Sequence, residues 1–176
     1  MEYIDIVNDK GELTGQSESR DSVHQKGLLH RHIHVWIINS NNEVLLQRRS
    51  PNKKTYANMW AMSAEGHVSA GKSLEETVID EVREELNIIL SPKQLKLEFS
   101  YTRGRIEFAN NWVENGINYV YIVKNDTPLE KITIQESEVS DVKWMKLNDY
   151  KIEVENENSE YRLYPKEYSL LFKLIK

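Results

Sequence analysis

The stretch GHVSAGKSLEETVIDEVREELNI, residues 66–88, runs from a glycine-bearing loop into a helix that is rich in glutamate. Ser73 is a favoured N-cap residue, and Glu76 three positions later completes a capping box, so the helix is predicted at 74–87. Its buried stripe is expected to consist of apolar residues at every fourth position: Leu74, Val78, Val82 and Leu86.

Three glutamates of this helix share one face. Glu81, Glu84 and Glu85 are spaced three and four positions apart, and carboxylates at that spacing repel one another. No lysine or arginine lies three or four positions from any of them, and Arg83 is expected to point away from the cluster. A hard divalent cation bound by carboxylate oxygens would compensate the charge, whereas a solvated acidic face is the alternative interpretation.

The same residues resemble the Nudix box, a motif of Gly, five residues, Glu, seven residues and Arg-Glu-apolar-any-Glu-Glu-any-Gly-apolar. Gly66, Glu81, the pair Glu84 and Glu85, and Ile88 match it at the required spacing. The resemblance implies that the glutamates hold Mg²⁺ or Mn²⁺ against a diphosphate, helped by a backbone carbonyl at or near Gly66. Water would then attack phosphorus and split a nucleoside diphosphate from another group. We therefore expect a hydrolase similar to MutT, a pyrophosphatase of nucleoside diphosphate derivatives.

Three positions depart from the box. Lys72 stands where the family has glutamate, and Asp80 stands where it has arginine. The family's two residues are thought to pair as a brace between loop and helix, so a brace of reversed polarity is our hypothesis. Asn87 replaces the last glycine, and asparagine tolerates a left-handed helix end. The metal-binding glutamates are intact, so we do not interpret the box as inactive.

The resemblance covers residues 24–144 and is closest to the branch that includes isopentenyl diphosphate isomerase and its hydrolase relatives. It implies an α/β fold in which a mixed β-sheet is sandwiched between α-helices. At 176 residues the chain is expected to form a single Nudix domain. Its parts would be an N-terminal hairpin at 1–15, a core at about 24–150 and a C-terminal helix at about 165–175.

The other elements follow from composition and turn residues. Residues 16–25 are expected to form a loop or a short helical turn, and residues 150–164 a loop. Strands are predicted at 30–38, 44–48, 95–101, 106–109, 117–123 and 137–145, with a turn at 103–104. The C-terminal helix is expected to bury one face: Tyr168, Leu171, Phe172 and Ile175.

Histidines suggest a second cation site. The isomerases have a metal-ligating histidine at the position of His67, directly after the first glycine of the box. His24 and His30 resemble two further ligands of the same metal, although the spacing between them differs by one. A structural role is the alternative for these three residues. His32 and His34 alternate along a strand and are expected to serve packing or solvent contact.

Arg49 and Lys53 match the basic residues that grip the diphosphate in the isomerase branch, and the alternative is a solvated basic loop. Glu114 matches one of two isomerase glutamates and is expected at the substrate, whereas the second is Gly116 here. The isomerase cysteine corresponds to Glu65, and the chain has no cysteine. Isomerisation needs an acid and a base on opposite faces of the substrate, so this alternative activity is disfavoured.

The catalytic base is expected to be Glu84 or Glu85, because both would lie near a metal-bound water. Glu114, Glu136 and Glu138 are further candidates. A non-catalytic domain that binds a diphosphate ligand is a second alternative to the hydrolase.

The charge and composition of the chain argue against some classes of binding partner. The net charge of −5 and pI near 5.6 argue against a nucleic-acid backbone or an anionic membrane. Residues 1–12 lack the basic start and apolar run of a signal peptide, and no apolar stretch approaches membrane-spanning length. We expect a cytoplasmic protein that binds a small-molecule diphosphate. Dimers are common among the relatives, so a homodimer stays open.

Overall fold

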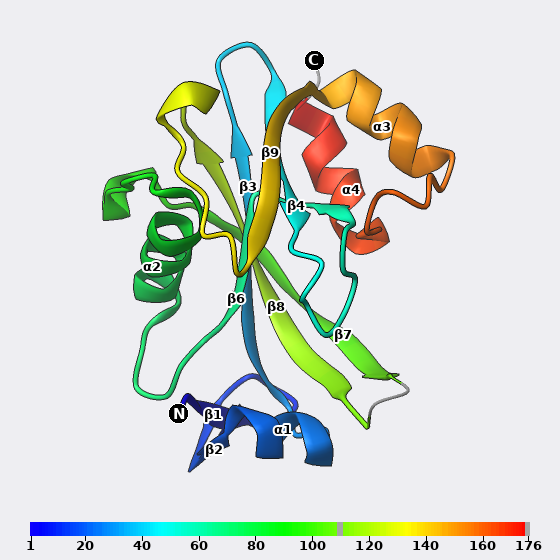
Figure 1. Ribbon diagram of the computed structural model, residues 1–176. Coiled ribbons are helices and arrows are strands. Elements are labelled where there is room, and N and C mark those ends of the chain that lie inside the picture. The colour runs from blue at the N-terminus through cyan, green and yellow to red at the C-terminus, as the bar shows by residue number, and fades with distance from the viewer. Residues whose placement is uncertain (109–110, 175–176) are drawn as a thin grey trace.

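The computed structural model describes residues 1–108 and 111–174, and within them it has nine strands and four α-helices. The strands form a mixed sheet with α2 on one side and α3 and α4 on the other (Figure 1). This is the predicted α/β arrangement. The strands are β1 (Tyr3–Val7), β2 (Leu13–Ser19), β3 (His30–Ile38), β4 (Glu43–Arg49), β5 (Trp60–Ala61), β6 (Ala64–His67), β7 (Leu97–Glu107), β8 (Val113–Lys124) and β9 (Val139–Lys146). The helices are α1 (Arg20–Lys26), α2 (Leu74–Leu86), α3 (Leu147–Glu155) and α4 (Pro165–Leu171).

Strand β3 organises the sheet because it is buried on both faces. It pairs antiparallel with β1, β4 and β6 and parallel with β8. Ile33 and Val35 belong to the core layer that contains the apolar stripe of α2. Trp36 and Ile38 belong to the layer under α3 and α4. Side-chain alternation along one strand thus supplies both core layers, and the predicted bounds of this strand are confirmed.

Helix α2 begins at Leu74, as predicted, and ends at Leu86, one residue before the predicted end at Asn87. The Oγ atom of Ser73 accepts a hydrogen bond from the backbone N–H of Glu76 at 3.1 Å, and the Glu76 carboxylate accepts one from the N–H of Ser73 at 2.9 Å. Asn87 caps the last turn in the left-handed conformation, with φ of 55°. Most of the predicted stripe is buried, although Leu74 is half-buried; the buried members are Val78, Val82 and Leu86.

The prediction of two strands at 95–101 and 106–109 is wrong. Strand β7 is a continuous strand, not two strands around a turn at 103–104. Gly104 has a φ of +92°, and the register with β8 shifts between Thr102 and Gly104. The glycine therefore forms a bulge inside a long hairpin arm. The end of the predicted strand 106–109 lies outside the described residues.

Two predicted loops contain helices. The hairpin of β1 and β2 continues to Ser19, and α1 follows directly, with Ser19 as its N-cap and Gly27 as its left-handed C-cap. Helix α3 occupies the start of the predicted loop 150–164, because Tyr150 and Val154 are buried against the sheet. Near the C-terminus, α4 ends at Leu171 and a 3₁₀ turn, Phe172–Leu174, continues it. Ile175, predicted on the buried face, lies outside the described residues.

Among residues 1–108 and 111–174, no helix is both long enough and apolar enough to cross a membrane.

Candidate active site

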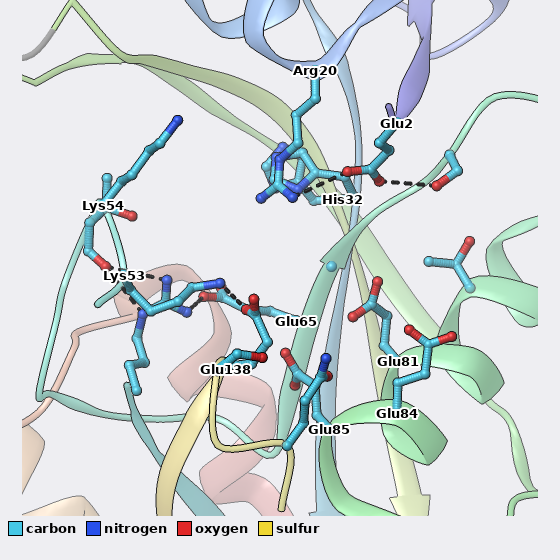
Figure 2. A pocket seen from close by; sticks show the side chains of 18 of the residues that line it. Glu2, Arg20, His32, Lys53, Lys54, Glu65, Glu81, Glu84, Glu85 and Glu138 are labelled. Carbon is cyan, nitrogen blue, oxygen red and sulfur yellow. Dashed lines mark hydrogen bonds and ion pairs between the residues drawn. The ribbon is translucent and has the colours of Figure 1, made fainter. Parts of the chain in front are cut away.

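A cavity of about 570 Å³ opens between α2, β6 and the loop after β4, and charged side chains dominate its lining. Figure 2 shows Glu81, Glu84 and Glu85 on one side, Lys53 and Lys54 on the other, and Glu2 and Arg20 at a third edge. Most of the residues that the sequence predicts for the site line this cavity: Arg49, Lys53, Gly66, His67, Lys72, Asp80, Glu81, Glu84, Glu85, Glu114 and Glu138. Three predicted residues are not among its lining residues: His24, His30 and Glu136. The structure thus brings most of them together, while their roles stay predictions.

The acidic wall of the cavity comes from α2. Glu85 is almost fully buried and accepts a hydrogen bond from the Gln47 amide at 3.0 Å. Glu81 lies directly against Gly66, where any Cβ atom would collide with the Glu81 side chain. A larger residue at position 66 would therefore displace the Glu81 side chain from its place beside β6.

Burial and mutual repulsion raise the pKa of two of these carboxyl groups and so favour their protonated forms. Burial, and then the charge of Glu84, raises the pKa of Glu81 to about 8. Burial, and then the charge of Glu81, raises the pKa of Glu85 well above its ordinary value. A divalent cation between them would favour the carboxylate forms, and oxygen ligands suit Mg²⁺. The donor set therefore fits such an ion.

The environment of Glu84 differs from the prediction. Its side chain is 57% exposed, and Arg83 Nη2 lies 3.7 Å from one of its carboxylate oxygens. The prediction that Arg83 points away from the cluster is wrong, because its flexible side chain turns toward Glu84 and also binds Asp80. Glu84 is the accessible member of the three.

Lys72 and Asp80 form an ion pair between the loop and the helix. The Lys72 Nζ atom donates to Asp80 Oδ2 at 2.6 Å, and this hydrogen bond raises the pKa of Lys72 and lowers that of Asp80. Lys72 and Asp80, whose charges are exchanged relative to the Nudix box, thus lie in contact.

The basic wall of the cavity is held by carboxylates. Arg49 donates to Glu65 and, at 3.3 Å, to the carbonyl of Thr55. Lys53 forms an ion pair with Glu138. Arg48, one residue before Arg49, lies outside the cavity lining and donates to the carbonyl of Asn58 at 3.0 Å. Strand alternation thus sends neighbouring arginines to different places.

Sequence reasoning missed one arginine of this wall. Arg162 lies between α3 and α4, is 5% exposed, lines the cavity and donates to the same Glu65 oxygen as Arg49. Its position is 97 residues from Glu65 in sequence. No spacing pattern joins the two positions, and the charge of Arg162 within an otherwise aromatic and apolar YRLYP segment was the available signal.

Four histidines and Glu114 form a cluster at another edge of the cavity. Ligand atoms of His24, His30 and His67 lie within 4.8 Å of one another, and so do those of His32, His67 and Glu114. The three α2 glutamates form no such group among the described residues. His32 therefore belongs to the cluster, with its Nε2 2.6 Å from that of His30. It is buried, which agrees with the predicted role in packing and not with solvent contact.

The histidines are in the form that binds metals. Burial lowers the pKa of His30 to about 4 and lowers those of His32 and His67 well below their ordinary value. Neutral imidazoles are cation ligands, so this donor set is suited to a second cation.

Comparisons with known proteins agree with this geometry. The sequence pattern of the NUDIX domain matches residues 28–166. Nudix hydrolase 3 of Arabidopsis thaliana is 33% identical over 180 residues; the match covers 99% of this chain and 23% of that protein, so the chain spans less than a quarter of its length.

Two further comparisons concern the isomerase branch of the family and the fold. An isopentenyl-diphosphate Delta-isomerase of Escherichia coli is 32% identical over 84% of this chain and 79% of its own length. The crystal structure of DR0079 from Deinococcus radiodurans covers 99% of this chain and 100% of its own, with a TM-score of 0.70 and 18% identity. At that identity the last comparison establishes the fold alone.

Proposed function

Since this chain belongs to the Nudix family, we propose that it hydrolyses a diphosphate linkage in a nucleoside diphosphate derivative, with Mg²⁺ or Mn²⁺ held by its glutamates. The observation that carries this proposal is the pair of opposed walls in one cavity. Carboxyl groups of α2 line one side and Lys53 lies on the other (Figure 2), and Arg49 of β4 also lines the cavity. A diphosphate between them would meet a cation on one side and basic side chains on the other.

The residues divide into roles by their environment. Glu81 and Glu85, with the carbonyl of Gly66, would hold the cation, and Gln47 fixes Glu85 through its amide. The bound ion would neutralise phosphate oxygens and lower the pKa of the attacking water. Glu84 is exposed and lies on the same helix face, so it completes the ligand set and is our candidate to accept the proton of that water.

The other candidate bases have weaker positions. Glu138 is paired with Lys53, and Glu114 accepts a hydrogen bond from Trp112 Nε1 at 2.8 Å. Glu136 is absent from the residues that line the cavity in the described part of the chain. We assign Glu114 to the substrate-facing edge, where it and His67 would hold a second cation with the other histidines.

The isomerase activity is disfavoured by the environment of Glu65. Burial alone would raise the pKa of Glu65, but Arg162 and Arg49 lower it below its ordinary value. Glu65 therefore favours its carboxylate form, held by two arginines, and the chain has no cysteine to replace it, so one of the two proton-transfer groups of the isomerases is missing.

The test is a hydrolysis assay over nucleoside diphosphate sugars, dinucleoside polyphosphates, ADP-ribose, nicotinamide dinucleotides, nucleoside triphosphates and isopentenyl diphosphate, with magnesium or manganese. Glu84→Gln is expected to lower turnover about 100-fold or more. Glu75→Gln, an exposed position on the same helix, is the matched control and should leave turnover unchanged. Absence of turnover over the panel, in folded protein that binds magnesium, would favour a non-catalytic diphosphate-binding domain.

A further inference from the structure

Two buried arginines meet on one carboxylate oxygen in the wall of the cavity. Arg49 and Arg162 are 7% and 5% exposed, and both donate through Nη1 to Oε1 of Glu65. The three residues come from β4, from the segment between α3 and α4, and from β6. All three line the cavity. Folding therefore brings these three residues together from separate segments of the chain.

The charges of this group do not balance. Two guanidinium groups share one carboxylate, which leaves one positive charge in excess. The remaining hydrogen bonds of Arg49 go to the neutral carbonyl of Thr55. Within the described part of the chain, Nε of Arg162 is buried without a hydrogen-bond partner, and its guanidinium packs on the rings of Tyr56 and Tyr164, at 4.2 and 5.0 Å.

The carboxylate behind Glu65, that of Glu167, is already occupied by other partners. Glu167 accepts hydrogen bonds from Trp36 and Tyr101, each at 2.6 Å, and its Oε1 lies 2.6 Å from Nδ1 of His34. Nε2 of the same histidine lies 3.8 Å from Glu65. Glu167 thus supports His34 behind Glu65 and does not neutralise the arginines. A buried charge without a direct counter-ion is costly, so a pair of arginines that share one carboxylate favours the binding of an anion from the cavity.

We propose that Arg162 and Arg49 form a two-guanidinium clamp for one phosphate of the substrate, with Glu65 as the internal counter-ion that aligns them. This inference rests on the proposed function and names the group that binds the diphosphate on the wall opposite α2. Arginine forks match phosphate oxygens in pairs, so two of them select a phosphate over a single carboxylate. The C-terminal segment thereby contributes a substrate-binding residue.

The probe is methylenediphosphonate, whose P–C–P bridge cannot be hydrolysed, added to metal-free protein in EDTA and followed by titration calorimetry. Arg162→Gln is expected to weaken binding about tenfold or more, since charge-assisted hydrogen bonds are lost. Arg162→Lys keeps the charge without the fork and should give an intermediate affinity. Arg48→Gln, next to Arg49 but outside the lining, is the matched control and should bind as the unmodified protein does.

Glu65→Gln separates a clamp from a purely structural ion pair. Removal of the internal negative charge is expected to tighten binding of the probe, because the phosphonate no longer competes with a carboxylate. A structural pair would instead lose stability and leave the affinity unchanged or weaker. Near-UV circular dichroism identifies the variants that are folded, and Arg162→Lys decides the question if Arg162→Gln is not.

Two results would overturn the clamp: equal affinity in the Arg162 variants and the unmodified protein, or no binding to any of these proteins, Glu65→Gln included. The assay involves no turnover, so it fails or succeeds independently of the proposed activity. If the variants bind methylenediphosphonate with the expected affinities but no substrate of the panel is hydrolysed, the proposed hydrolase activity is rejected and the clamp is supported. If a substrate is hydrolysed but substitution of Arg162 leaves the affinity for methylenediphosphonate unchanged, the hydrolase is supported and the clamp is rejected.

Discussion

Glu81 is a carboxyl group whose protonation depends on the folded state. Burial raises its pKa from 4.5 in an ordinary environment to about 8. Between these values the unfolded chain releases a proton that the folded chain keeps. The contribution of Glu81 to stability is therefore fully present below pH 4.5 and is lost as the pH rises through 8, at up to about 1.4 kcal/mol per pH unit.

The histidines act in the opposite direction. Burial lowers the pKa of His30 from 6.5 to about 4, so its contribution is lost as the pH falls below 6.5. Metal-free protein should therefore have a lower urea midpoint at pH 8 than at pH 6.5, and Glu81→Gln should reduce the difference. Added magnesium should stabilise the protein more at the higher pH. An unchanged difference in the variant would contradict the raised pKa.

At the residue scale the sequence predicts the glutamates of the acidic wall and two basic residues of the opposite wall, Arg49 and Lys53, but it misses Arg162. Glu81, Glu84 and Glu85 lie within one helix, where a spacing of three and four positions determines which side chains share a face. Arg162 and Glu167 reach the site from the far end of the chain, through the packing of α4 on the sheet. Periodicity carries no information about such long-range contacts.

Among the elements, the loop before α2 is tied to that helix by the ion pair of Lys72 and Asp80. Lys72→Glu and Asp80→Arg should each destabilise the protein, because each places like charges in contact. The double variant restores an opposite pair with the family's polarity. Exposed pairs contribute about 0.2–1 kcal/mol, and a urea double-mutant cycle should give a coupling energy in that range. Strictly additive effects would show that the contact does not act as a brace.

The elements themselves were predictable where their signals are local. The capping box and the apolar stripe of α2 lie in contiguous sequence, and both are found in the structure. The bulge in β7 was misread because a glycine with positive φ serves a turn and a bulge alike. Helix α3 was missed because it is only nine residues long; its buried residues, Leu147, Tyr150 and Val154, do follow helical spacing of three and four positions.

At the scale of the whole molecule, Glu167 connects helix α4 to the sheet through hydrogen bonds. Its carboxylate binds Trp36, Tyr101 and His34, all on other elements. Glu167→Ala removes the hydrogen-bond partner of the buried Trp36 and His34 side chains and one partner of Tyr101, and it should lower the free energy of unfolding by about 3–5 kcal/mol. Glu167→Gln keeps part of the hydrogen bonding and should cost less.

Chemical unfolding followed by tryptophan fluorescence measures both changes. Ser169→Ala, an exposed position on the same helix, is the control and should stay within about 0.5 kcal/mol of the unmodified protein. A loss for Glu167→Ala no larger than that of Ser169→Ala would mean that α4 is held by apolar packing alone.

The two walls of the cavity have different origins in the chain. The acidic wall comes from one continuous stretch, whereas the basic wall is assembled from β4, the loop after it and the segment before α4. Substitutions in those separate segments can accumulate one at a time without disturbing the cation ligands. A change inside the continuous stretch needs a second, compensating change, as the reversed pair of Lys72 and Asp80 illustrates. Divergence within such a lineage is therefore expected to alter the choice of substrate sooner than the chemistry of cleavage.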